Sequence, residues 1–134
     1  SHIPDLPLDE VSFTDNSWQR SRRYLYGIDL FNAGFWWEAH EVLEELWIQC
    51  GRTTQVARFL QGILQVSAAL LKYSIWNPRG ARRLKARAIE KLELHSGVFL
   101  GIDVDLLVSQ VVMYIDGEQL HPPRIELSGL EGRH

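Results

Sequence analysis

The residues best suited to chemistry in this sequence are His40 and Glu44, four positions apart in the segment 36–50. At that spacing on a helix, an imidazole nitrogen and a carboxylate oxygen reach one another or a shared third atom. Three interpretations are open: a hydrogen-bonded structural pair, two ligands of a divalent metal, or an acid and a base acting without a metal. The sequence leaves the catalytic residues unassigned and does not decide whether the protein is an enzyme.

The segment 36–50 is predicted to form a helix with an unusually wide apolar arc. The arc is built from Trp36, Ala39, Val42, Leu43, Leu46, Trp47 and Cys50, and continues to Trp37 and Ile48. His40 and Glu44 interrupt this arc, whereas the solvent face contains Glu38, Glu41, Glu45 and Gln49. A carboxylate placed among tryptophans must be paired, protonated or bound, because burying an unpaired charge costs several kcal/mol or more. We therefore expect a buried centre made of His40 and Glu44.

A metal at this centre needs a donor from another helix, because two ligands are too few for a site. The apolar segment that follows has a narrow polar stripe, and Gln61 or Gln65 could supply that donor or hydrogen-bond the pair as a second shell. The ions expected are zinc, manganese or iron. The order His-Glu-x-x-Glu differs from the zinc-protease pattern His-Glu-x-x-His by lacking the second histidine.

The elements that position these residues are predicted to be five helices, which makes the fold class all-α. An extended arm over residues 1–15 precedes a single helical domain over residues 16–117, and residues 118–134 form a tail. Helix starts are predicted at Thr53 or Thr54, at Asn77 followed by Pro78, and at Asp103. The third helix, which begins after Thr53 or Thr54 and extends to about residue 76, is apolar around most of its circumference. We therefore expect it at the centre of the array.

Composition excludes several classes of protein. The 134 residues suit one compact domain, and a net charge of −3 provides no global attraction to nucleic acid or to anionic membranes. Cys50 is the only cysteine, which excludes a disulfide framework and favours a reducing, cytoplasmic location. No apolar stretch is long enough to span a bilayer.

Three blocks of the sequence resemble the bacterial and archaeal family known as domain of unknown function 309. They are Phe31–Trp47, Phe59–Gln65 and Asn77–Ala81, and the resemblance extends over about residues 20–95. It implies an all-α domain whose His-x-x-x-Glu-x-x-Trp motif, here His40, Glu44 and Trp47, binds a metal. It implies no activity, and both terminal arms lie outside it.

The predicted fourth helix has a basic face. It contains Arg79, Arg82, Arg83, Lys85, Arg87 and Lys91, with Glu90 and Glu93 nearby to neutralise part of it. RNA binding there is a third hypothesis, but nucleic acid is not the expected partner because no aromatic residue alternates with the arginines. The second hypothesis is a non-enzymatic protein-interaction module in which the His/Glu pair is structural. Five tryptophans and an apolar third helix also predict a homodimer.

Overall fold

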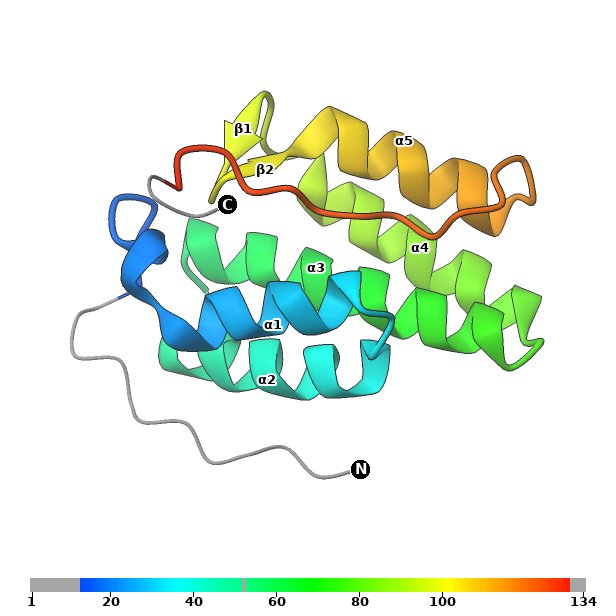
Figure 1. Ribbon diagram of the computed structural model, residues 1–134, viewed down its shortest axis with the longest axis horizontal. Coiled ribbons are helices and arrows are strands. Elements are labelled where there is room, and N and C mark those ends of the chain that lie inside the picture. The colour runs from blue at the N-terminus through cyan, green and yellow to red at the C-terminus, as the bar shows by residue number, and fades with distance from the viewer. Residues whose placement is uncertain (1–12, 52, 131–134) are drawn as a thin grey trace.

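The computed structural model describes residues 13–51 and 53–130, so residues 1–12 of the predicted N-terminal arm lie outside the described part. Five α-helices make up most of these described residues, which confirms the all-α prediction (Figure 1). They are α1 (Arg22–Asn32), α2 (Trp36–Gln49), α3 (Gln55–Ser74), α4 (Pro78–Leu92) and α5 (Val104–Ile115). No helix of the described residues has both the length and the apolar composition needed to cross a bilayer.

The helix starts follow the predicted capping chemistry. The Thr54 side chain accepts the Ala57 N–H at 3.1 Å, and the Asp103 carboxylate accepts the Leu106 N–H at 3.1 Å. Asn77 caps α4 in the same way, with Pro78 at the first helical position. Each cap satisfies a backbone N–H that the helix itself leaves without a partner.

α3 is the central helix. It packs against α2 on one side and α4 on another, while α1 packs on α2 (Figure 1). Gly62 allows α4 to approach closely, because a Cβ at that position would lie 2.9 Å from Cδ2 of Leu92. Ten residues of α3 are buried, which is the burial that its nearly continuous apolar surface predicts.

A short β-hairpin between α4 and α5 was not predicted. The strands β1 (Val98–Phe99) and β2 (Ile102–Asp103) pair antiparallel in the segment that follows the end of α4 at Leu92. Strands of two residues are too short to show an alternating pattern in the sequence. Tyr24 anchors the hairpin by donating its hydroxyl to the Leu100 carbonyl at 2.7 Å, and burial raises the pKa of that hydroxyl well above its usual value.

The non-helical segment after α5 lies against the helices. Residues 118–130, called the strap below, return along the molecule between α5 and α1 and pass in front of α3 (Figure 1, orange to red). Pro123 and Ile125 of the strap are buried. The described part of the predicted tail therefore completes the hydrophobic core.

Candidate functional site

His40, Glu44 and Trp47 lie along one edge of α2. His40 and Trp47 are partly buried, but Glu44 is exposed. The expected buried His40/Glu44 centre is therefore wrong for the carboxylate. The pair borders the solvent, and water can hydrate the Glu44 side chain without a protein partner.

The error comes from the width of the apolar arc. The residues of α2 that are buried are Ala39, Val42, Leu43 and Leu46. Trp37 and Ile48, which widened the projected arc, are about half exposed. Because these two residues belong to the outer surface, the side of α2 that contains Glu44 belongs to it as well.

Glu45 is the α2 carboxylate that contacts a buried charge. Its Oε2 lies 3.1 Å from Nε of Arg23 on α1, and Arg23 is almost completely buried. The sequence projection placed Glu45 on the solvent face, and its own side chain is indeed mostly exposed. The projection of α2 alone could not show that Arg23, buried on the neighbouring helix α1, lies next to Glu45.

Gln61 and Gln65 are both partly buried on α3. The Gln65 side-chain oxygen accepts a hydrogen bond from Nζ of Lys91 at 2.9 Å, so this glutamine contacts α4. Within the part of the chain that is described, no hydrogen bond joins either glutamine to His40 or Glu44. Gln65 is thus engaged by an ammonium group, which competes with any role as a metal ligand or second shell.

Metal binding stays a prediction for His40 and Glu44. Among residues 13–51 and 53–130, no three His, Cys, Asp or Glu side chains gather into a group that could hold a metal ion. His40 offers an imidazole nitrogen and Glu44 offers carboxylate oxygens, from consecutive turns of α2. The remaining donors would have to be an amide, such as Gln61, or water.

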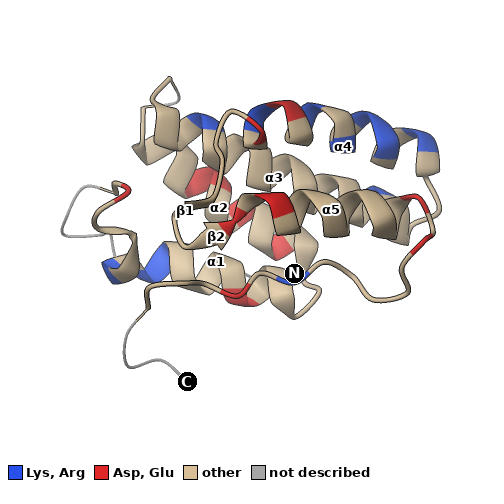
Figure 2. Ribbon diagram, turned by 90° about the horizontal axis from the view of Figure 1, so that it is seen from above, with Lys and Arg blue, Asp and Glu red and all other residues tan. Residues whose placement is uncertain are grey.

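The other prominent polar surface is the basic face of α4 (Figure 2). Two of its lysines are engaged: Lys85 pairs with Asp116 at 3.1 Å, and Lys91 bonds Gln65. Four arginines are exposed and have no ion-pair partner among the described residues: Arg79, Arg82, Arg83 and Arg87. Neither Glu90 nor Glu93 takes part in the ion pairs of the described residues, so any neutralisation of this face acts at longer range.

Trp76 stands at the start of this arginine face and is 92% exposed. Its φ is +62°, a left-handed conformation, and the Asn77 N–H bonds the Lys72 carbonyl across it at 2.9 Å. This is the hydrogen-bond pattern that usually places glycine after the end of a helix. At the same left-handed position α1, α2 and α5 have glycine, at Gly34, Gly51 and Gly117, whereas α3 has tryptophan.

The sequence contained a signal for Trp76 that was missed. The very short connection between the third and fourth helices requires a chain reversal at the residue before the cap Asn77. That reversal favours glycine, and a tryptophan in its place is a local conflict between residue and backbone.

A comparison with known families finds a match, which covers part of the chain. Residues 24–84 match the sequence model of the family "Domain of unknown function (DUF309)", which confirms the resemblance over this part of the chain. No curated protein matches the sequence. The matched residues include α2, α3 and the beginning of the arginine face.

Proposed function

We propose that this domain is a non-enzymatic binding module for single-stranded RNA, with the exposed arginines of α4 holding phosphates and Trp76 stacking on a base. The observation that supports it is Trp76, exposed in a strained backbone conformation just before α4, whose four exposed arginines have no ion-pair partner among the described residues. A left-handed conformation costs a non-glycine residue roughly 1–2 kcal/mol. Because the indole ring is almost fully exposed, packing offers little to offset that cost, and strain of this kind is typical of functional positions.

The charge arrangement on α4 supports an anionic ligand. Arg79, Arg82 and Arg83 lie in the first two turns of the helix, which has no acidic residue in its first turn. The N-terminal end of a helix has a positive partial charge of its own, so cations there repel it. An anion would relieve both the repulsion among the arginines and their repulsion by the helix dipole.

The aromatic ring of Trp76 favours RNA over other anions as the ligand, because bases can stack on it. Proteins that bind single strands combine a positive track for the backbone with aromatic rings on which bases stack. The sequence alone disfavoured nucleic acid because no aromatic residue lies among the arginines of the helix. Trp76 supplies that ring from the turn just before it.

Fluorescence anisotropy with a labelled single-stranded RNA of mixed sequence tests the proposal. Arg83→Glu should weaken binding and lower the slope of log affinity against log salt by about 0.7, the value for one phosphate contact on a single strand. Trp76→Gly should weaken binding roughly 10-fold, since one stacked base contributes about 1–3 kcal/mol. Arg22→Glu, an equal charge change at an exposed arginine of α1, is the matched control and should leave both quantities nearly unchanged.

Two results would contradict the proposal. One is an absence of salt-dependent binding to the wild-type protein at low ionic strength. The other is equal weakening by Arg83→Glu and Arg22→Glu together with full binding by Trp76→Gly, because that pattern describes attraction by overall charge without a defined surface.

A further inference from the structure

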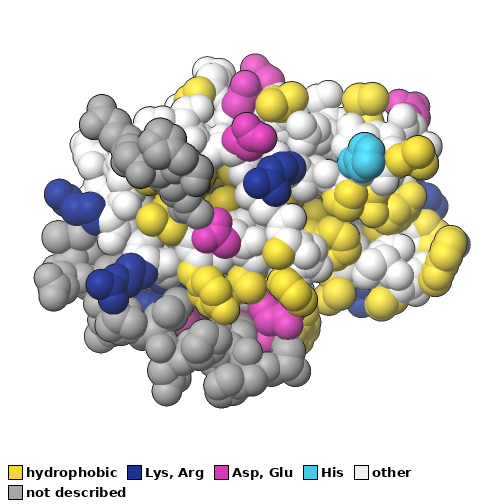
Figure 3. Space-filling model, in the orientation of Figure 1, with side chains coloured by type: hydrophobic (Ala, Val, Ile, Leu, Met, Phe, Trp, Pro, Cys, Tyr) yellow, Lys and Arg dark blue, Asp and Glu magenta, His cyan; other side chains and the backbone are white. Residues whose placement is uncertain are grey.

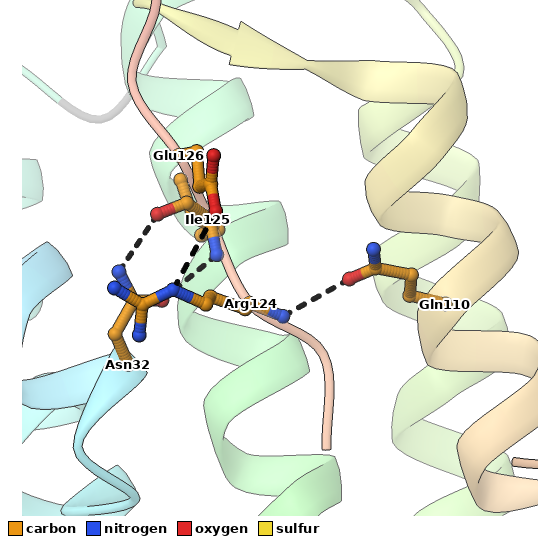
Figure 4. A network of polar contacts seen from close by, with 5 residues as sticks. All are labelled: Asn32, Gln110, Arg124, Ile125 and Glu126. Atoms are coloured by element: carbon orange, nitrogen blue, oxygen red, sulfur yellow. Dashed lines mark hydrogen bonds and ion pairs between the residues drawn. The ribbon is translucent and has the colours of Figure 1, made fainter. Parts of the chain in front are cut away.

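The strap is held in a groove between α1 and α5 by contacts to its backbone (Figure 4). The Asn32 side chain donates to the Ile125 carbonyl at 2.7 Å and accepts the Ile125 N–H at 2.8 Å. From the opposite wall, Oε1 of Gln110 accepts the Arg124 N–H at 3.0 Å. The Asn32 side chain thus forms with Ile125 the two hydrogen bonds that a residue of a neighbouring β-strand would form with it.

The hydrogen bonds that hold the strap in the groove involve its backbone and not its side chains. A fourth hydrogen bond, from the Ser128 N–H to the Gly101 carbonyl at 2.8 Å, also uses the strap's backbone. The Arg124 side chain approaches Glu126 within the strap itself, at 3.8 Å. Pro123 and Ile125 are buried and Leu127 packs against the core, so the site accepts an extended segment with apolar residues at alternate positions.

The groove is wider than the strap that occupies it. A cavity of about 320 Å³ lies on the α5 side and is lined by Ile102, Leu106, Gln110 and strap residues. A second cavity of about 360 Å³ lies on the α1 side, beside Ile28, Asp29 and Asn32. The strap is therefore flanked by space on both sides, and an exchanged strap would have to refill the core positions of Pro123 and Ile125.

The connection to α5 is suited to a change of direction. Gly117 has φ +81°, and Leu120 just beyond it is 93% exposed. On the face seen in Figure 3, hydrophobic side chains gather mainly toward the end where α5 passes into the strap. Leu120 and the partly exposed Met113 would be buried if a second copy lay against this end.

We infer that the groove between α1 and α5 is a binding site for an extended peptide segment, and that its partner is the strap of a second copy of this chain, exchanged reciprocally in a dimer. The exchanged strap makes the same hydrogen bonds and buries the same isoleucine, so exchange costs little beyond association entropy. Contact around Leu120 adds apolar burial that the single chain lacks. This inference does not depend on RNA binding.

A peptide probe tests the groove. In the full-length variant Ile125→Asp the chain's own strap cannot seat, so a labelled synthetic peptide of residues 119–130 with the natural sequence should bind at least 10-fold more tightly than to wild type. Adding Asn32→Ala to that variant should abolish the binding. Glu126→Gln is the matched control, because its exposed side chain leaves the strap seated, and it should bind no more peptide than wild type.

Mixing two variants tests the partner. Neither Asn32→Ala nor Ile125→Asp should dimerise alone, but after unfolding and refolding together they should form a mixed dimer by light scattering, because one chain retains the groove and the other the strap. If circular dichroism shows that Ile125→Asp does not fold, Ile125→Ala replaces it in both experiments. Absence of peptide binding overturns the groove as a site, and peptide binding without a mixed dimer overturns the second copy as its partner.

Discussion

Arg23 and Glu45 form the ion pair that joins α1 to α2, with Nε of the arginine 3.1 Å from Oε2 of the glutamate. The side chain of Arg23 is 7% exposed and that of Glu45 is 58% exposed, so a buried cation reaches outward to a carboxylate at the surface. Such a pair protects a charge whose isolation in the interior would be costly. The neighbouring Glu44 on the same helix forms no ion pair among the described residues.

This difference predicts opposite outcomes for two adjacent substitutions. Glu45→Ala should lower the free energy of unfolding by about 1–2 kcal/mol, because the buried guanidinium loses a charged hydrogen-bond partner that is itself partly hydrated. Glu44→Ala should change it by less than about 0.5 kcal/mol, as exposed substitutions usually do. Urea denaturation of both variants measures the two values, and a larger loss for Glu44→Ala would restore a buried His40/Glu44 centre.

His95 gives the fold a dependence on pH. It is buried between two phenylalanines, stacked on Phe99 at 4.0 Å between ring centroids and edge-on to Phe59, and its Nε2 has no hydrogen-bond partner among the described residues. Burial lowers the pKa of this imidazole below its ordinary value of 6.5. The folded protein therefore favours the neutral ring.

The sign of the effect follows from the direction of that shift. Below about pH 6.5 the unfolded chain takes up the proton before the folded one, so the stability from neutral His95 is complete above that pH and is lost as the pH falls. His95→Phe keeps the ring contacts and cannot titrate. Urea denaturation at pH 7.5 and 5.5 should show a smaller loss for the variant than for wild type, and equal losses would mean that His95 protonates freely in the folded state.

Trp76→Gly is expected to leave the fold at least as stable as wild type. Glycine removes a left-handed strain of roughly 1–2 kcal/mol, and the greater freedom of the unfolded chain returns about 0.5–1 kcal/mol of that gain. Trp76→Ala retains a Cβ at positive φ and should show no such gain, which makes it the matched control. A loss of more than about 1 kcal/mol in Trp76→Gly would show that the indole ring packs against the protein and is not held for a ligand.

Metal binding by His40 and Glu44 is tested by calorimetric titration of metal-stripped protein without a histidine tag. If the prediction holds, zinc, manganese or iron binds with modest affinity, and acid displaces the ion by protonating the imidazole. His40→Ala should abolish the heat of binding, whereas His121→Ala, at an exposed position of the strap, should not. No saturable heat with any of the three ions would exclude the metal interpretation of this motif.

The sequence by itself determined the five helices of the described residues and the residues at which three of them begin. Thr54, Asn77 and Asp103 are caps because their side chains bond backbone groups three residues away, and interactions that local are encoded within a few positions. The apolar surface of α3 was likewise sufficient to predict that it is central, since only a narrow stripe of such a helix can face solvent. The prediction that residues 36–50 form a helix with a His/Glu motif also depended only on nearby residues.

Only the tertiary structure decided which side of α2 is inside, and hence that Glu45 has the buried partner and Glu44 does not. An apolar arc that includes tryptophans at its margins is compatible with several rotations of the helix, and the packing of Leu43 against Gly27 of α1 selects one of them. The strap shows the same limit more strongly, because Asn32 and Ile125 are 93 positions apart. In the strap, Pro123, Ile125 and Leu127 alternate with exposed residues, but nothing in the segment itself identifies Asn32 as the partner of its backbone.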